Sequence, residues 1–185
     1  MKDEKVILAV QQWVDTFVVG MNLCPFAKRE LVKNRVRFVT TESTTPEQLL
    51  RALQVELELL NADPSVETTL LIHPQVLQDF YDFNDFLSDA DSLLMEMALE
   101  GVYQIASFHP DYQFGGTTPS DAENYTNRSP YPVLHLIREA SLERAIADYP
   151  DVDDIPERNI ALMNNLGEEK LQALLKSCLQ VRKLL

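Results

Sequence analysis

The chain has 185 residues, of which 45% are hydrophobic, so it is long enough to bury the core of one domain. Its 29 acidic residues outnumber its 16 Lys and Arg residues and give a formal net charge of −13. Such an acidic surface repels phosphate backbones and anionic lipids, so we expect neither nucleic acid nor a membrane as a partner. The expected organisation is a single domain over residues 1–185.

The N-terminal residues and the cysteines indicate a cytoplasmic protein. Acidic residues precede the first apolar run, Val6 to Val10, and no small-residue cleavage site follows it, which is not typical of a signal peptide. No run approaches the roughly 18 to 20 apolar residues of a membrane-spanning helix. Cys24 and Cys178 lie far apart in the sequence, and we expect two free thiols in a reducing compartment.

The first part of the chain predicts two helices and an edge strand. Apolar residues three and four apart predict a helix over 3–21, which we expect to end at a left-handed Gly20. Pro25 favours the start of a short second helix, because proline suits the first helical position. Residues 35–41 alternate and are rich in β-branched and aromatic side chains, which is typical of a strand.

The middle of the chain continues with alternating helices and strands. Thr45 is a predicted cap for a helix with a leucine stripe, and residues 68–72 read as a strand covered on both faces. Residues 74–100 predict a helix, in one piece or two, that ends at Gly101. A third strand is expected over 102–108.

This order predicts an α/β fold with a mainly parallel sheet of three or more strands and helices on its faces. A long segment without periodicity, 110–132, follows the third strand. Helices are then expected at about 133–149, 154–166 and 167–183, with a turn between the first two, so that the C-terminal third is helical.

Two predicted strands end in the same dipeptide, His73-Pro74 and His109-Pro110. In a parallel sheet both histidines would stand at the carboxyl edge, where open α/β folds bind their ligands. Because imidazole titrates near neutral pH, we expect His109 and His73 to act as general acid and base, oriented by Asp111. The alternative is structural: each His-Pro ends its strand, with the imidazole bonded to a loop carbonyl.

The long segment after His109 is expected to be ordered or functional, since it holds four aromatic residues that a solvated linker would not need. Gly115-Gly116 within it marks a backbone turn or a close approach.

Residues near the end of this segment predict an anion site. Asn127, Arg128 and Ser129 lead toward an expected helix that carries His135 and Arg138 on one face. Amides at a helix start and a guanidinium would bind an anionic group of a substrate. Alternatively, Arg128 pairs with one of the many carboxylates and Ser129 is only a cap.

Two further features bear on chemistry. Three histidines, or two with Asp111, would suit zinc or iron, but neither HExxH nor CxxC is present. A metal is therefore an alternative, and no cofactor is predicted. Cys24 would be a reactive thiol at a helix start, but its apolar neighbours favour a buried structural cysteine.

Several segments carry a resemblance to a known family. The sequence resembles domain-of-unknown-function family 1415 in Asn22-Leu23-Cys24-Pro25-Phe26-Ala27, Leu71-Ile72-His73-Pro74, residues 106–114, Asn127-Arg128-Ser129-Pro130-Tyr131-Pro132 and residues 134–140. The resemblance covers roughly residues 5 to 170 and implies a bacterial cytoplasmic protein without assigning a catalytic role. Gly115 departs from the alanine common in the family, which weakens any role specific to that residue.

The leading hypothesis is a small-molecule enzyme or binding protein that acts on an anionic metabolite, by hydrolysis or proton transfer if it is an enzyme. One alternative is a metal-dependent, hydrolase-like protein that uses the same histidines with zinc or iron. Another is a non-enzymatic adaptor or homo-oligomer subunit with the aromatic segment as its contact surface.

Overall fold

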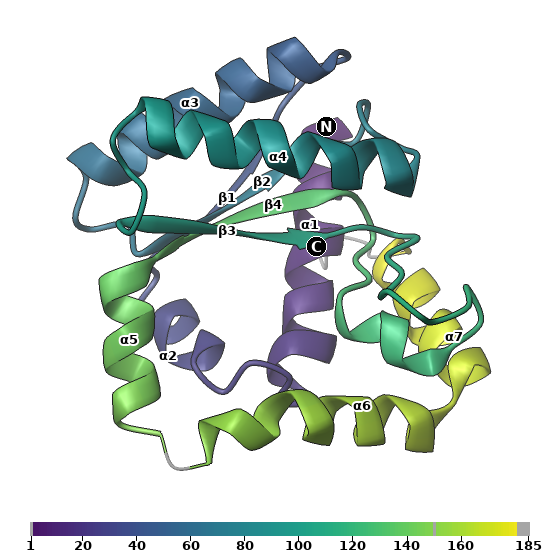
Figure 1. Ribbon diagram of the computed structural model, residues 1–185. Coiled ribbons are helices and arrows are strands. Elements are labelled where there is room, and N and C mark those ends of the chain that lie inside the picture. Colours follow the sequence, from purple (N-terminus) through teal and green to yellow (C-terminus); the bar gives the residue numbers. More distant parts are fainter. Residues whose placement is uncertain (1, 150, 181–185) are drawn as a thin grey trace.

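The computed structural model describes residues 2–149 and 151–180 (Figure 1). Four strands form one sheet: β1 (Val36–Thr40), β2 (Thr68–Ile72), β3 (Tyr103–Phe108) and β4 (Val133–Arg138). The α-helices are α1 (Lys2–Trp13), α2 (Ala27–Val32), α3 (Pro46–Ala62), α4 (Phe80–Glu96), α5 (Glu139–Ala147), α6 (Ile155–Leu166) and α7 (Glu168–Cys178). Short π or 3-10 segments are η1 (Val14–Val19), η2 (Ala122–Thr126) and η3 (Val152–Asp154). In this part of the chain, no helix is both long and apolar enough to cross a membrane.

The sheet is mixed, and the prediction of a mainly parallel sheet is wrong. Its strand order is β1-β2-β4-β3, and only β1 and β2 pair in parallel. β4 is antiparallel to both of its neighbours, β2 and β3. The α/β class and the presence of at least three strands are confirmed.

The prediction of a parallel sheet failed because one element was predicted incorrectly: residues 133–138 form a strand, where a helix was expected. Val133 pairs with both Ile72 and Phe108, so β4 enters the sheet at the edge where β2 and β3 end. A strand that enters there can only run back against its neighbours. Val133, Leu134 and Leu136 are buried, as expected for a central strand covered on both faces. The predicted helix begins only at Glu139, as α5.

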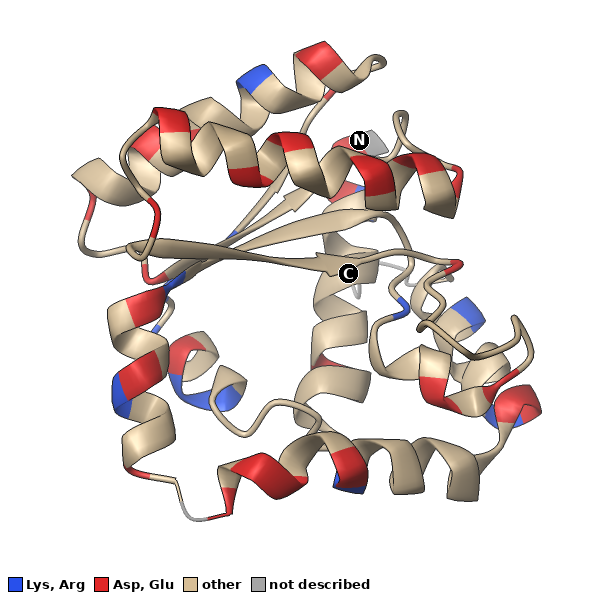
Figure 2. Cartoon of the chain, in the orientation of Figure 1, with Lys and Arg blue, Asp and Glu red and all other residues tan. Residues whose placement is uncertain are grey.

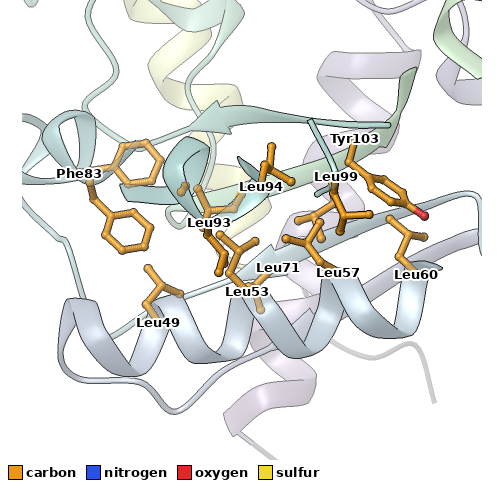
Figure 3. Packing of buried hydrophobic residues seen from close by; sticks show 14 of the residues in the cluster. Leu49, Leu53, Leu57, Leu60, Leu71, Phe83, Leu93, Leu94, Leu99 and Tyr103 are labelled. Atoms are coloured by element: carbon orange, nitrogen blue, oxygen red, sulfur yellow. The ribbon is translucent and has the colours of Figure 1, made fainter. Parts of the chain in front are cut away.

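Helices α3 and α4 cover one face of the sheet with a closed apolar core (Figure 3). The cap of α3 is confirmed, because the Thr45 side chain accepts a hydrogen bond from the Gln48 amide. Leu49, Leu53, Leu57 and Leu60 of α3 are fully buried. These residues pack in one cluster with Phe83, Leu93 and Leu94 of α4 and with Leu71, Leu134 and Leu136 of the sheet.

The opposite face is covered less evenly by α1, α2, α5, α6 and α7 (Figure 1). Trp13 and Phe17 pack with Leu70, Ile72 and Val133 of the sheet in a second cluster. The C-terminal helices contribute buried side chains to the same cluster: Met163 of α6, and Leu171 and Cys178 of α7.

The predicted first helix extends as expected, but its end differs. α1 continues as the π-helix η1, and Gly20 is right-handed, with φ −62°. The Gly20 amide donates to the Asp15 carbonyl, and a Cβ at Gly20 would lie 2.5 Å from the Thr16 carbonyl oxygen. Gly20 is therefore needed for a close backbone approach, and the prediction of a left-handed stop is wrong.

Other helix boundaries moved by a few residues. α2 starts at Ala27 rather than Pro25, and α4 starts at Phe80 because residues 74–79 form a turn in which Leu77 has φ +54°. The helix predicted over 154–166 is confirmed as α6. α7 ends at Cys178, and residues 181–183 of that prediction, like Pro150 of the predicted turn, lie outside the described residues.

Candidate functional site

His73 and His109 meet at one edge of the sheet. They directly follow β2 and β3, which run in the same direction because each is antiparallel to β4. Both rings pack against Phe83 of α4, with ring centroids 5.5 Å away for His73 and 5.1 Å away for His109. Both side chains are fully buried.

Each imidazole is bonded to a backbone carbonyl of the turn over residues 74–79. His73 Nδ1 lies 3.1 Å from the Val76 carbonyl oxygen and donates to it, which leaves Nε2 as a buried nitrogen without a partner. His109 Nδ1 accepts from the Asp111 amide at 3.0 Å, so Nε2–H donates to the Leu77 carbonyl at 3.1 Å. These bonds fix the turn to the end of the sheet.

Burial keeps both imidazoles uncharged at neutral pH. It lowers the pKa of His73 to about 4, and the neighbouring His109 acts in the same direction. Burial also lowers the pKa of His109, against the opposing effect of the Asp111 and Asp79 carboxylates. The catalytic roles of His73, His109 and Asp111 stay predictions, and full burial of the two rings means that a substrate would need the turn to open.

Arg128 and Ser129 bind the backbone of their own loop, and Asn127 binds the backbone of β3. Arg128 donates to the carbonyls of Tyr112 and Pro119 at 3.1 and 2.8 Å and lies over the Tyr125 ring. The Ser129 hydroxyl donates to the Tyr131 carbonyl, and the Asn127 amide donates to the Ser107 carbonyl. Asp111, Arg128 and Ser129 border a hollow of about 160 Å³. Their predicted role in substrate binding is untested.

The long loop is ordered by its own side chains, and Asn124 is central to it. Asn124 is fully buried, accepts from the Phe114 amide and the Thr117 hydroxyl, and donates to the Thr118 carbonyl. Gly116 has φ +83°, and no atom of the described residues lies within 4 Å of the position that a Cβ would occupy. The glycine pair therefore serves a turn rather than a close approach.

His135 and Arg138 lie away from the other two histidines. The Arg138 guanidinium donates to the Tyr103 hydroxyl and to carbonyls of Leu60, Asp63 and Val66, which fixes the far end of β4. His135 is at the middle of β4 and pairs with Leu70 and Ala106. Its side chain points to the face opposite α3 and α4.

That face holds a cavity of about 620 Å³, here called the sheet cavity. It lies between the sheet and the helices α1, α2 and α5. Most of its wall is apolar: Trp13, Val14, Val18, Leu31, Val36, Leu70, Ala106, Phe108, Ile137, Leu142 and Ala145. Phe26 and Tyr149 stack edge to face at 5.5 Å and belong to the same wall.

Four small or uncharged polar side chains interrupt the apolar wall: Cys24, Thr68, His135 and Ser141. Burial lowers the pKa of His135 to about 4, so its ring is neutral at pH 7. Burial also raises the pKa of the Cys24 thiol, against hydrogen bonds from the Phe26 and Ala27 amides. Cys24 is thus a protonated, half-buried thiol, whereas Cys178 is fully buried, and both are free.

Charged side chains gather at the rim of the sheet cavity. Three arginines, Arg29, Arg35 and Arg144, lie there with three acids, Glu30, Glu67 and Asp148. Arg138 borders the cavity as well, but its guanidinium is turned toward Tyr103 and α3 on the other face of the sheet. Arg35 is held between Glu30 and Glu67, at 3.4 and 2.5 Å. Arg29 and Arg144 are exposed on α2 and α5, where Figure 2 shows basic residues next to acidic ones.

The metal alternative gains no support from the residues described. Across 2–149 and 151–180, no group of three or more His, Cys, Asp and Glu is placed to hold a metal ion. The three histidines cannot share one ion, since His135 faces the other side of the sheet.

Sequence reasoning did not find the sheet cavity, because a cavity is a space that side chains leave empty. One signal was present: Ala106 is a small residue in the middle of a strand otherwise rich in large ones. Its pairing with His135 leaves room above the ring.

The fold and the cavity define an α/β protein with a ligand-sized pocket on one face of its sheet. The chain belongs to the family described as "Protein of unknown function (DUF1415)", whose model matches residues 5–173. The resemblance seen in the sequence is thereby confirmed. No curated protein and no solved structure matches the chain.

Proposed function

We propose that the protein binds a small molecule with an apolar body and an anionic group in the sheet cavity. The size and lining of this cavity carry the proposal. Its volume of about 620 Å³ lies within the roughly 300–1,000 Å³ of typical ligand sites. Such sites combine an apolar wall with a few polar groups, as Cys24, Thr68 and His135 do here.

The distribution of charge supports an anionic group on the ligand. The whole chain has 16 Lys and Arg residues against 29 acids, whereas the rim of the cavity has as many arginine side chains as acidic ones, three of each. No Lys or Arg occurs from Ala52 to Asn127, so all charged residues of α4 are acidic, as Figure 2 shows. The acidic excess of the chain as a whole is therefore absent at the rim of the cavity.

Arg29 and Arg144 are the residues proposed to hold the anionic group. Arg35 is paired with two glutamates and Arg138 with backbone carbonyls, so both are already engaged. Arg144 donates to the Ser141 hydroxyl, and Arg29 contacts Glu30 at 3.4 Å. Both guanidinium groups are exposed, and each retains donors for a carboxylate or phosphate.

A fluorescence titration with 8-anilinonaphthalene-1-sulfonate, which has an apolar body and a sulfonate, tests the proposal. We expect saturable binding of one equivalent to the wild type and a loss of this binding in Ala106→Phe, whose ring would occupy the centre of the cavity floor beside His135. Ala147→Phe is the matched control, because Ala147 is exposed on α5 and outside the cavity lining. Equal binding by both variants would refute the proposed site.

The rim is tested with a pair of probes. The Arg29→Gln/Arg144→Gln variant should bind the sulfonate probe roughly threefold to tenfold more weakly, because exposed charges contribute modestly to binding. Binding of the uncharged N-phenyl-1-naphthylamine should be unchanged. Equal losses for both probes would show that the arginines do not recognise charge.

Acid/base chemistry at His73 and His109 is a separate proposal. It keeps the expectation of an enzyme that acts on an anionic metabolite, and the unpartnered Nε2 of His73 supports it. The binding proposal does not depend on it, since neither histidine lines the sheet cavity.

A further inference from the structure

His135 is the polar centre of the cavity floor. It lies on β4 between Leu70 of β2 and Ala106 of β3, and all three side chains line the sheet cavity. Phe108 completes this part of the floor, with its ring 6.3 Å from the imidazole. A ligand in the cavity would therefore contact the imidazole ring.

The hydrogen bonds of Thr68 determine which nitrogen of His135 is bare. The Thr68 hydroxyl has one proton, and it donates that proton to the Leu136 carbonyl at 2.5 Å. The same oxygen lies 2.8 Å from His135 Nε2, so it must accept from Nε2–H. A neutral imidazole with a proton on Nε2 has a lone pair on Nδ1.

Nδ1 is thus a hydrogen-bond acceptor that its surroundings do not use. Among the bonds of the described residues, His135 is engaged only through Nε2. At the rim of the same cavity, the Glu67 carboxylate oxygen Oε1 is buried without a partner, while Oε2 binds Arg35. Both unused atoms that border the cavity are acceptors, and both would be satisfied by a donor.

We infer that the ligand of the sheet cavity carries a neutral hydrogen-bond donor, a hydroxyl or an N–H, which binds Nδ1 of His135 at the floor. This inference rests on the proposed function and names the chemical class of its ligand: an apolar acid with a hydroxyl or N–H at the end remote from the acidic group. An anionic group at the floor would face the Nδ1 lone pair in an apolar surrounding, so it belongs at the rim, near Arg29 and Arg144.

Two probes, one with a hydroxyl donor and one with that hydroxyl methylated, test this inference, and the His135 variants separate the hydrogen bond from the size of the methyl group. 6-Hydroxy-2-naphthoate and 6-methoxy-2-naphthoate share the apolar body and the carboxylate. The wild type should bind the hydroxy compound roughly threefold to tenfold more tightly, the range expected for one neutral hydrogen bond. His135→Leu should abolish this preference, and His135→Gln should retain part of it, because the amide oxygen of glutamine is also an acceptor.

Nitrogen NMR of the wild type keeps the test independent of the variants. The resonance of the unprotonated Nδ1 of His135 should shift on binding the hydroxy compound and much less on binding the methoxy compound. If both compounds bind equally and Ala106→Phe still blocks them, the inference is overturned and the proposed function stands. If neither compound binds the wild type, the proposed function falls, and the inference with it.

Discussion

The two faces of the sheet are covered in different ways. Between the sheet and the α3–α4 pair, leucine and phenylalanine side chains fill the space, and Leu49, Leu53 and Phe83 have no exposed surface (Figure 3). On the other face, α1, α2 and α5 stand apart and leave a cavity of about 620 Å³. The filled face stabilises the fold, and the hollow face provides a place for a ligand.

Truncation of one leucine on each face should give the largest difference. Leu53→Ala removes a fully buried side chain and should lower the free energy of unfolding by about 2–5 kcal/mol. Leu142→Ala, in the half-buried wall of the sheet cavity, should cost on the order of 1 kcal/mol. Urea unfolding measures both, and equal losses would mean that the two faces are packed alike.

The pH dependence of stability should reflect two buried imidazoles, one on each side of the sheet. His73 stacks on Phe83 of the filled half and His135 lies in the hollow half, and both have a pKa lowered to about 4 by burial. The unfolded chain has imidazoles with a pKa of about 6.5 and takes up protons first as the pH falls. The free energy of unfolding should therefore be at its full value above about pH 6.5 and fall as the pH decreases toward 4. The part of this loss that comes from His73 is roughly 3 kcal/mol.

NMR titration reads these histidines one by one. Both should stay neutral to well below pH 6 in the folded protein. If the imidazole of His135 titrates at the ordinary pH for histidine and that of His73 at a low pH, water must fill the cavity and solvate the His135 ring. That result would sharpen the contrast between the two faces of the sheet.

Enlarging one alanine on each face should have opposite consequences. Ala90→Phe adds a ring to the filled core, where Ala90 has no exposed surface, and should destabilise the fold by about 1–3 kcal/mol. Ala106→Phe adds the same ring to the sheet cavity and should be neutral or stabilising. Thermal unfolding compares the two, and a large loss in Ala106→Phe would indicate a cavity too small to accept the ring.

The smallest expected difference between the two parts of the molecule is the rate at which Cys24 and Cys178 are alkylated. Cys24 lines the sheet cavity and Cys178 is fully buried, and burial raises the pKa of both thiols. Both should react slowly with iodoacetamide at pH 7.5, Cys24 first, and a bound ligand should slow Cys24 alone. Faster labelling of Cys178, followed by peptide mass spectrometry, would contradict its full burial.

Sequence reasoning succeeded where local pattern decides structure. The leucine stripe of α3, its Thr45 cap and the buried strand β2 follow from spacing and side-chain type alone. The meeting of His73 and His109 also follows, since it needs only that β2 and β3 point the same way. β2 and β3 do run in the same direction, even though β4 lies between them in the sheet.

The rest depended on partners that a sequence does not display. Residues 133–138 form a strand because two neighbouring strands hold them on both sides, and their apolar run suits a helix as well. The π-helix before Gly20 and the space beside Ala106 arise from packing between distant segments. Arg128 and Arg138 look like anion-binding residues in the sequence, but they bind backbone carbonyls.

The position of β4 also has a consequence for biosynthesis. β4 is the last strand to leave the ribosome, yet it is the strand that joins β2 to β3. Until residue 138 emerges, the β1–β2 ribbon and β3 are separate pieces, each with an unpaired edge that can recruit another chain. A prematurely terminated chain that stops before residue 133 would therefore be prone to aggregate, although it contains three of the four strands and all of α3 and α4.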